Sequence, residues 1–395
     1  MWKTKQYDIV IVGAGPAGST FARIAASNGL SVLLLERKNR IGVPVRCGEG
    51  VIDSALRLFY EPRPSWIATT IDKFCFITPN GSSTTVKMKE KGYVLNREVF
   101  DYDLAKFAAD EGGTVITNAN VNGLLFENDK VVGVKGICNS EPFELRAKLV
   151  IGADGVESRI GQMAGINTKI KLENIDSGYQ KTVSGIKVNR NVCSFHVSNK
   201  LTPGGYIWIF PKGNNSANIG IGISGKAHIN GKSAKTRLNE FLDSKYPNHK
   251  VESISVGGIP LSQPIKRMVT DSVMLIGDAA RTVNPLSGSG IILGMKSAVK
   301  AADVANKILR RGEEPTKINL MDYQKRWMNS EGKQINRIYR IKTAVDKLTD
   351  KDLNNIIEKV NKLPAEKRSL VRIFRACIPQ KPSLLFDVAK VFVGY

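Results

Sequence analysis

The chain has 395 residues, of which 42% are hydrophobic and 24% charged, an ordinary globular composition. Because domains usually hold roughly 100–200 residues, this length predicts two or three lobes. The formal net charge is +22, from 58 Lys and Arg against 36 Asp and Glu. Such a charge suits a membrane surface or an acidic ligand, but it equally describes a solvated, lysine-rich surface. No nucleic-acid-binding motif is recognisable, so we expect no nucleic-acid partner.

Cysteine usage and hydropathy indicate a reducing compartment. The odd number of cysteines and the absence of Cys-x-x-Cys pairs argue against a disulfide framework and against a zinc site, so we predict no metal. These cysteines are Cys47, Cys75, Cys138, Cys193 and Cys377. The polar start predicts no signal peptide, and no apolar run reaches the roughly 18 residues of a membrane span. We therefore expect a cytoplasmic protein, soluble or peripheral at the inner face of the cell membrane.

The first elements predict a βαβ unit. Residues 7–12 are a short apolar run typical of a buried parallel strand, and residues 31–35 form a second. A helical stretch between them reaches about Asn28. Glu36 ends the second strand, at the place where an acid can bind the hydroxyls of a ribose.

A glycine fingerprint, Gly13-Ala14-Gly15-Pro16-Ala17-Gly18, joins the first strand to the helix. Gly13 permits a tight turn, Gly15 lets the backbone approach a pyrophosphate, and Gly18 permits close packing of helix on strand. The helix N-terminus then offers free amides and a positive dipole end to the phosphates. With a strand before, a helix after and an acid beyond, the fingerprint predicts a dinucleotide site.

The following elements alternate between strand and helix patterns. Asn96 is expected to cap with its side chain a helix that runs to about Glu111. From about 180 to 260 the pattern changes to alternating β segments. Further strands are predicted over 114–117, 121–126, 130–137, 148–151 and 273–276, and helices over about 290–310, 319–347, 350–361 and 365–376.

Two later segments complete the nucleotide motifs. Gly152-Ala153-Asp154-Gly155 closes one buried strand, and Gly277-Asp278 closes another, before a Gly-rich loop at 285–290. Together with the fingerprint, they resemble the glutathione-reductase-type flavoproteins, in their aromatic-hydroxylase and geranylgeranyl-reductase branch. The resemblance implies FAD as the cofactor, with Asp278 on its ribityl chain. It also implies that Gly290 and Ile291 face the flavin pyrimidine, where the helix dipole stabilises the reduced anion.

Two further segments are similar to motifs of the archaeal geranylgeranyl reductase family. They are the loop Pro44-Val45-Arg46-Cys47-Gly48-Glu49-Gly50 and the run 203–213, which fits P-x-x-Y-x-W-x-F-P-x-G at every fixed position. The resemblance covers most of the chain and is weakest beyond about residue 315. It implies saturation of C=C bonds in geranylgeranyl chains of membrane lipids or their precursors. Because the chain has only one complete glycine fingerprint, the implied electron donor is transiently bound NAD(P)H or ferredoxin.

Three alternating aromatic residues, Tyr206, Trp208 and Phe210, would share one face of a strand. Such a face is either ordinary core or an apolar wall along a polyprenyl chain. The family match favours the wall, so we predict that these three residues and Gly213 bind the substrate. Tyr206 and Trp208 are also candidate catalytic residues.

Cys47 is a candidate catalytic residue too, because Arg46 would favour its thiolate, although a small buried side chain without a chemical role is the alternative. Arg97 would grip a phosphate or the flavin, or lie on the surface. The resemblance implies cofactor contacts for both, and an adenine contact for the backbone of Val121. The predicted cofactor-binding residues are Gly13, Gly15, Ala17, Gly18, Glu36, Cys47, Gly48, Gly50, Arg97, Val121, Asp154, Asp278, Gly290 and Ile291.

The predicted fold class is α/β, with a Rossmann-like FAD-binding domain, an inserted antiparallel β-sheet substrate domain and a helical C-terminal region. The strands of the first domain lie far apart in the sequence, so one sheet is expected to collect them. The expected bounds are 1–75, 92–180 and 265–312 for the FAD-binding domain, 76–91 and 181–264 for the β-rich domain, and 313–395 for the helices.

The C-terminal helices carry many cations, which would suit anionic phospholipid headgroups. These are Lys325, Arg326, Lys333, Arg337, Arg340, Lys342, Lys367, Arg368, Arg372 and Arg375. The apolar segment 384–393 would either dip into the membrane interface or pack on the protein. Two other functions share parts of this pattern: a flavin monooxygenase or halogenase, and a prenyl-lipid carrier without turnover. The intact nucleotide motifs argue against the carrier.

Overall fold

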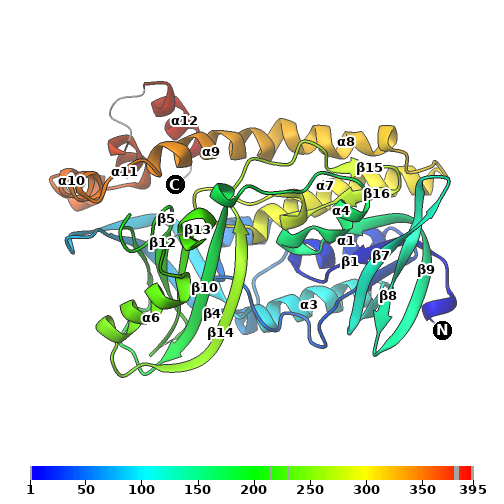
Figure 1. The fold of residues 1–395 in the computed structure, drawn as a ribbon, viewed down its shortest axis with the longest axis horizontal. Coiled ribbons are helices and arrows are strands. Elements are labelled where there is room, and N and C mark those ends of the chain that lie inside the picture. Colours follow the sequence, from blue (N-terminus) through cyan, green and yellow to red (C-terminus); the bar gives the residue numbers. More distant parts are fainter. Residues whose placement is uncertain (1, 214, 230, 378–381, 393–395) are drawn as a thin grey trace.

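The computed structural model describes residues 2–213, 215–229, 231–377 and 382–392, which form two lobes built on β-sheets and a helical end (Figure 1). The first sheet has the order β15-β16-β9-β1-β2-β6, and β7 and β8 extend it from β9. Its strands are β1 (Tyr7–Val12), β2 (Val32–Leu35), β6 (Thr114–Ile116), β7 (Ala119–Glu127), β8 (Lys130–Cys138), β9 (Glu141–Gly152), β15 (Val269–Thr270) and β16 (Val273–Leu275).

Strands distant in the sequence are neighbours in this sheet, as predicted. β1 pairs in parallel with β2 on one side and with β9 on the other, and β9 pairs in parallel with β16. The carboxyl ends of these parallel strands therefore meet at one edge, which is where ligands bind in open α/β sheets. Ile9, Val10 and Ile11 are fully buried, as expected for a parallel strand covered on both faces.

Three helices cover this sheet at the nucleotide motifs: α1 (Pro16–Ser27), α3 (Arg97–Asp110) and α7 (Ile291–Arg310), and α1 contacts both of the others. Pro16 is preorganised for the first turn of α1. The short α4 (Arg159–Met163) follows β9. Asn96 is the N-cap residue of α3, as expected, but its side chain accepts no amide of the helix; its side-chain amide instead donates to the carbonyl of Ser65, 3.4 Å away.

The second sheet has the order β14-β10-β13-β12-β11-β4-β5-β3. Its pairs are antiparallel except that β4 and β11 are parallel, so the expected antiparallel sheet is a mixed one. Its strands are β3 (Gly50–Ile52), β4 (Ile67–Ile77), β5 (Ser83–Leu95), β10 (Ile175–Ser184), β11 (Val192–His196), β12 (Tyr206–Pro211), β13 (Ser216–Ser224) and β14 (Lys250–Pro260), with helices α2 (Asp53–Arg57), α5 (Gly225–Ile229) and α6 (Ala234–Lys245).

The expected boundaries after residues 75, 91 and 180 fall inside β4, β5 and β10 of this sheet. Strands β3, β4 and β5 precede α3 in the sequence and yet pair into the second sheet. A boundary within a hydrogen-bonded strand would divide one ladder between two domains. We therefore propose that the second lobe comprises about residues 50–95 and 175–260.

The remaining helices are α8 (Lys317–Trp327), α9 (Lys333–Val345), α10 (Asp350–Asn361), α11 (Leu370–Ala376) and α12 (Pro382–Phe392). The helix predicted over 319–347 is divided by a π-helical turn at Met328–Gly332. In Figure 1, α8 and α9 follow one another along the molecule, and α10 to α12 gather at the end opposite the N-terminus. Residues 378–381 and 393–395 of the expected C-terminal region, including the last residue of segment 384–393, lie outside the described residues.

Within the described residues no helix combines the length and the apolar character needed to cross a membrane. All five cysteines are free thiols. The same part of the chain contains no cluster of three or more His, Cys, Asp or Glu side chains suited to a metal ion.

Candidate functional site

One cavity of about 940 Å³ has walls from both sheets and from the C-terminal helices. Every residue predicted to contact cofactor or substrate lines it, except Gly18 and Gly213. Gly18 packs behind the fingerprint turn. Gly213 follows β12 with φ +108°, and its amide donates to Thr69 Oγ1 at 3.2 Å, so its place in the structure is that of a turn residue.

The three fingerprint glycines differ in what surrounds them. A Cβ on Gly13, whose φ is +106°, would lie 2.4 Å from the carbonyl oxygen of Ala153, and one on Gly18 would lie 1.9 Å from that of Gly13. Both positions therefore require glycine for packing. Gly15 has nothing within 4 Å of an added Cβ, although its backbone lines the cavity. The space beside Gly15 is therefore free for a ligand.

Glu36 closes this half of the cavity as the sequence predicted. Its Oε2 accepts the amide of Ala14 and its Oε1 accepts the amide of Lys38, both at 3.0 Å. Two backbone hydrogen bonds fix the carboxylate at the carboxyl end of β2. In this position it can accept hydrogen bonds from the hydroxyls of a ribose lying on the fingerprint.

Two aspartates, which follow β9 and β16, line the same cavity. Asp154 Oδ2 accepts the amide of Ile160 at 2.9 Å, whereas its buried Oδ1 has no hydrogen-bond partner within the described chain. Burial raises the pKa of Asp154, and backbone hydrogen bonds oppose that rise. Burial also raises the pKa of Asp278, against the nearby Arg97, and a Cβ on Gly290 would lie 3.1 Å from Asp278 Oδ1.

These residues fit FAD. The open face of Gly15 admits a pyrophosphate, Glu36 admits a ribose, and Asp154 supplies an acceptor that lacks a partner. The N-terminus of α7 begins at Ile291 beside Asp278 and lines the same cavity, so its free amides face into it.

Arg97 lies in the cavity wall at the start of α3 and is held by a partner that the sequence analysis missed. Its Nε and Nη2 donate to the two carboxylate oxygens of Asp101 at 2.6 and 2.7 Å; the Asp101 side chain is buried and that of Arg97 is 11% exposed. The carboxylate, with smaller contributions from Cys47 and Glu49, raises the pKa of Arg97 despite its burial. The spacing of four residues on a helix was a usable signal for this pair.

The thiolate expected at Cys47 is wrong. Arg46 is exposed and does not determine the state of the thiol, while burial raises the pKa of Cys47 and Arg97 only partly opposes it. The thiol is therefore neutral near pH 7. Its sulfur accepts the amide of Glu49 at 3.2 Å, and Glu49 pairs with Lys212 at 2.6 Å, which fixes the loop on β12.

The aromatic residues of β12 face the cavity together. Trp208 Nε1 donates to Gln180 Oε1 at 2.8 Å, and Gln180 Nε2 donates to the carbonyl of Cys47 at 2.9 Å. A Cβ on Gly48 would lie 3.0 Å from the ring of Phe210. The loop 44–50 therefore lies directly on the aromatic wall. Gln180 was missed because β10 reaches β12 only across β13, a pairing that no local pattern reveals.

The far end of the cavity is mostly apolar, although the polar side chains of Gln334 and Lys342 on α9, and of Asp346 at the end of that helix, also line the cavity. Phe74, Phe76 and Phe195 line it from the second sheet. The helices add Ile338, Val345, Leu348, Leu353, Ile356, Ile357, Leu370, Ile373, Phe374, Cys377 and Val391. One continuous space thus leads from the nucleotide motifs, past the aromatic wall, to the helical end.

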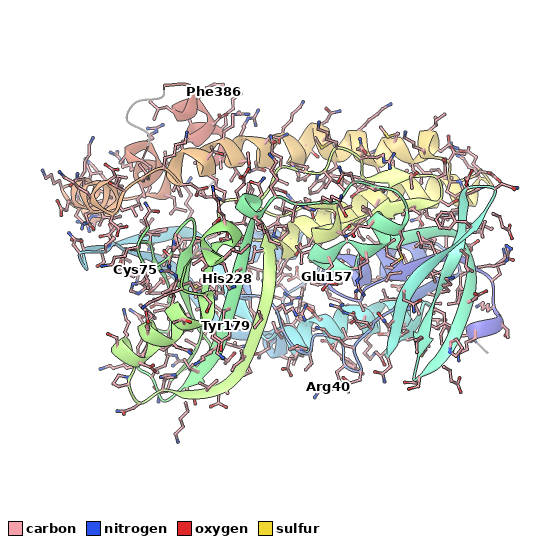
Figure 2. All side chains as sticks on the ribbon, in the orientation of Figure 1. Arg40, Cys75, Glu157, Tyr179, His228 and Phe386 are labelled. Atoms are coloured by element: carbon pink, nitrogen blue, oxygen red, sulfur yellow. The ribbon has the colours of Figure 1, made fainter. Side chains whose placement is uncertain are left out.

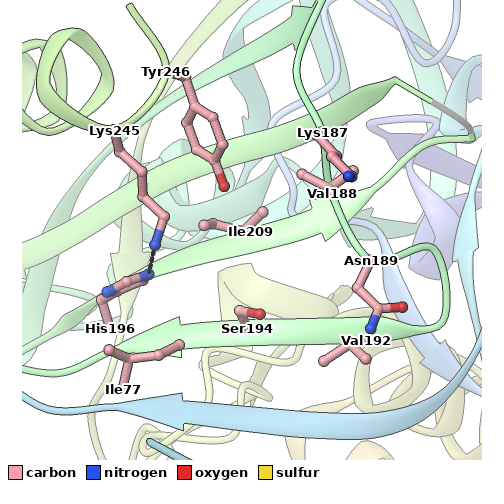
Figure 3. Close-up of a pocket in the computed structure, with 10 residues that line it drawn as sticks. All are labelled: Ile77, Lys187, Val188, Asn189, Val192, Ser194, His196, Ile209, Lys245 and Tyr246. Atoms are coloured by element: carbon pink, nitrogen blue, oxygen red, sulfur yellow. Dashed lines mark hydrogen bonds between the residues drawn. The ribbon is translucent and has the colours of Figure 1, made fainter. Parts of the chain in front are cut away.

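A second pocket of about 120 Å³ lies on the other face of the same sheet (Figure 3). It contains Ser194 and His196, which alternate along β11 with the cavity-lining Phe195. Lys245 Nζ lies 3.2 Å from His196 Nε2, and burial together with this cation lowers the pKa of His196 to about 4. None of the predicted site residues lines this pocket, so the large cavity is the candidate site.

Two known domain families match separate parts of the chain. Residues 11–66 match an NAD(P)-binding Rossmann-like domain, and residues 174–259 match the geranylgeranyl reductase catalytic domain. Digeranylgeranylglycerophospholipid reductase 1 of Methanococcoides burtonii is 38% identical, over 98% of this chain and 95% of its own. The digeranylgeranylglycerophospholipid reductase of Methanocella arvoryzae is 37% identical, over 97% and 98% respectively.

Solved structures agree with this fold. A geranylgeranyl bacteriochlorophyll reductase-like protein of Thermoplasma acidophilum superposes with a TM-score of 0.90 at 30% identity, covering 98% of this chain and 99% of its own. The myxobacterial chondrochloren halogenase has a TM-score of 0.70 at 18% identity, covering 97% of each chain. The halogenase thus shares the fold alone.

Proposed function

The chain belongs to the digeranylgeranylglycerophospholipid reductase family, and from this premise we propose that it is an FAD-dependent reductase of geranylgeranyl chains in membrane lipids or their precursors. Bound and reduced, FAD supplies the hydride that saturation of a C=C bond requires. The observation that carries the proposal is the single cavity that joins the nucleotide motifs to an apolar tunnel. A soluble substrate would not need such a tunnel, whereas a polyprenyl chain would fill it.

The residues of this chain have three tasks in the proposal. The fingerprint, Glu36 and Arg97 bind the cofactor. Tyr206, Trp208 and Phe210 hold the alkene along the wall and exclude water, since the aromatic surface is apolar. Cys47 does not act as a thiolate; its neutral thiol accepts the amide of Glu49 and so supports the loop 44–50. The electron donor is proposed to be ferredoxin or NAD(P)H bound without a domain of its own.

We also propose peripheral contact with an anionic membrane at the helical end. On α12, Leu385 and Phe386 are 39% and 61% exposed, and Lys390 Nζ lies 4.1 Å from the ring centroid of Phe386 (Figure 2). The opposite face of this helix packs inward through Val388, and Val391 lines the cavity. Within the described part of α12 the two expectations therefore concern different faces, and the membrane contact of the outward face is part of the proposal.

Not all of the expected cations can serve that contact. Lys342 is only 6% exposed and pairs with Asp346, so it does not belong to the basic surface. Arg340 donates to both carboxylate oxygens of Asp387, at 2.9 and 2.7 Å, and so fastens α12 to α9. Lys325, Lys333, Lys367, Arg372 and Arg375 are exposed and remain candidates.

Blocking the tunnel tests the function. Val345 lines the cavity and is only partly buried, so Val345→Trp should fill the apolar end without disturbing the nucleotide half. We expect FAD content and reduction by dithionite to be retained, and anaerobic lipid-dependent reoxidation of the flavin to fall at least tenfold. Ile318→Trp, at a residue 84% exposed, is the matched control. Equal activity of both variants would refute the tunnel.

Oxygen-dependent turnover of NAD(P)H with an aromatic substrate would favour the monooxygenase alternative.

A further inference from the structure

A cluster of ionisable groups, of which Asp176 and Lys342 are buried and Asp346 reaches the surface, lies in the cavity wall where β10 faces α9. Asp176 is 3% exposed and Lys342 is 6% exposed, and both line the cavity together with Asp346. Lys342 Nζ forms an ion pair with Asp346 Oδ2, so its charge is already compensated. The buried Oδ1 of Asp176 has no hydrogen-bond partner in the described part of the chain.

Two glycines make room for this carboxyl group beside the aromatic wall. A Cβ on Gly205 would lie 2.9 Å from Asp176 Oδ2, and one on Gly222 would lie 3.2 Å from it. Gly222 pairs with Tyr206 on one side and with Gly178, two residues from Asp176, on the other. The carboxyl group therefore occupies the space left by missing side chains, next to the first aromatic residue of the wall.

Tyr206 lies between the Asp176 carboxyl group and the nucleotide half of the cavity. Its hydroxyl donates to the carbonyl of Ser287 at 2.5 Å, in the loop that precedes α7. Burial raises the pKa of Tyr206, and the neighbouring Asp176 and Cys47 raise it further. Neither the tyrosine nor the thiol gives up a proton readily near pH 7.

Asp176 differs from Tyr206 and Cys47 in its acidity. Burial raises the pKa of Asp176 to about 7, Asp346 adds to that rise, and Lys342 opposes it. An acid works best when its pKa is near the working pH. A charged carboxylate in the wall of an apolar tunnel costs desolvation free energy and makes no favourable contact with a hydrocarbon chain. A neutral carboxylic acid at the same place avoids that cost and holds a proton that can be transferred.

We propose that Asp176 is the acid that delivers the proton when a prenyl double bond is saturated. This inference rests on the proposed function. One alkene carbon takes a hydride with its electron pair from reduced FAD, which is thereby oxidised. The π-electron pair forms a C–H bond at the other carbon with the Asp176 proton. The resulting carboxylate remains beside Lys342 until it regains a proton from water.

The first test concerns the proton itself and needs no turnover. Infrared titration of the full-length protein should reveal a buried carboxylic acid band that disappears with a midpoint near pH 7. Asp176→Asn should lack that band. In Asp346→Asn the carboxyl band of Asp176 should still be present at acidic pH. Its titration midpoint should be lower than in the wild type, because the repelling charge of Asp346 is removed and Lys342 is left without its partner. Absence of a band that depends on Asp176 above pH 5 would overturn the inference.

The second test separates this inference from the function. With dithionite-reduced holoenzyme and a geranylgeranyl phospholipid, Asp176→Asn should lower the single-turnover rate of lipid reduction by about a hundredfold, within the range for general acids. The wild-type rate should fall as pH rises through 7, and the variant should lose that dependence. Equal rates and equal pH profiles would overturn the role of Asp176 while leaving the function intact. No lipid reduction by the wild type would instead contradict the proposed function, whatever the infrared result.

Discussion

At the scale of single residues, the fingerprint glycines serve two different purposes. Gly18 is required for packing, because its Cβ would meet the carbonyl oxygen of Gly13, whereas Gly15 faces open space. We expect Gly18→Ala to reduce the free energy of unfolding by about 1–3 kcal/mol or more, the usual cost of overpacking. Gly15→Val should leave apoprotein stability within about 1 kcal/mol and should instead weaken FAD binding.

Denaturant unfolding of the apoproteins and fluorescence titration with FAD measure these two effects separately. Gly29→Ala is a control for FAD affinity, because Gly29 does not line the cavity; its φ of +81° should cost the alanine about 1–2 kcal/mol of stability without changing FAD binding. Normal FAD affinity in Gly15→Val would contradict the assignment of the open space to the pyrophosphate.

Arg97 and Asp101 form a buried pair, and such pairs are costly to break. Asp101→Leu should destabilise the protein by about 3–5 kcal/mol, because it leaves the guanidinium buried and uncompensated. The double variant Arg97→Met/Asp101→Leu should recover much of that loss, and unfolding of the apoproteins by urea measures both. A double variant as unstable as the single one would mean that packing, rather than charge, explains the effect.

Asp176 also predicts a pH dependence of stability. Its pKa is raised from 3.8 to about 7 on folding, so between these values the folded state binds more protons than the unfolded state. Stability from this group is therefore present at low pH and is lost as pH rises, by at most roughly 4 kcal/mol across the window. The free energy of unfolding of the wild type minus that of Asp176→Asn should fall between pH 4 and 8. A constant difference would contradict the raised pKa.

At the scale of elements, local sequence patterns predicted the helices and strands that pack against elements next to them in the sequence. The βαβ unit, the aromatic strand β12 and the start of α7 were predictable because periodicity and glycine spacing act within one element. Residues 76–91, which include most of β5, were predicted to belong to the β-rich domain, but β3 and most of β4 were not. Their place in the second sheet depends on contacts between strands that are distant in the sequence, such as the parallel pairing of β4 with β11. Gln180 and Asp176 were missed for the same reason.

Strand β13 is an element-scale test of the aromatic wall. Gly220 pairs with Trp208, and a Cβ on Gly220 would lie 2.1 Å from the indole ring. Gly220→Ala should therefore cost about 1–3 kcal/mol in the wild type. In a Trp208→Leu background the same substitution should cost clearly less, because the ring that it displaces is absent. Additive effects in this double-mutant cycle would contradict the contact.

At the scale of the whole molecule, the cavity ends among helices that also present apolar and basic side chains outward. We expect binding to vesicles that contain anionic phospholipid, weakening as salt increases, because screening reduces the attraction of the exposed cations. Phe386→Asp should weaken binding about tenfold or more, from the loss of buried aromatic surface. Phe126→Asp, at a residue on β7 of the first lobe that is 51% exposed, should bind like the wild type. Cosedimentation measures both, and equal loss in the two variants would argue against docking through α12.

The central claim is that one cavity brings a prenyl chain to FAD. Its most direct test is the mass of the lipid after anaerobic incubation of the dithionite-reduced holoenzyme with a geranylgeranyl phospholipid. The products should be heavier by one pair of hydrogen atoms for each saturated double bond, and Val345→Trp should not form them. Unchanged lipid mass, from a protein that binds FAD and is fully reduced, would contradict it.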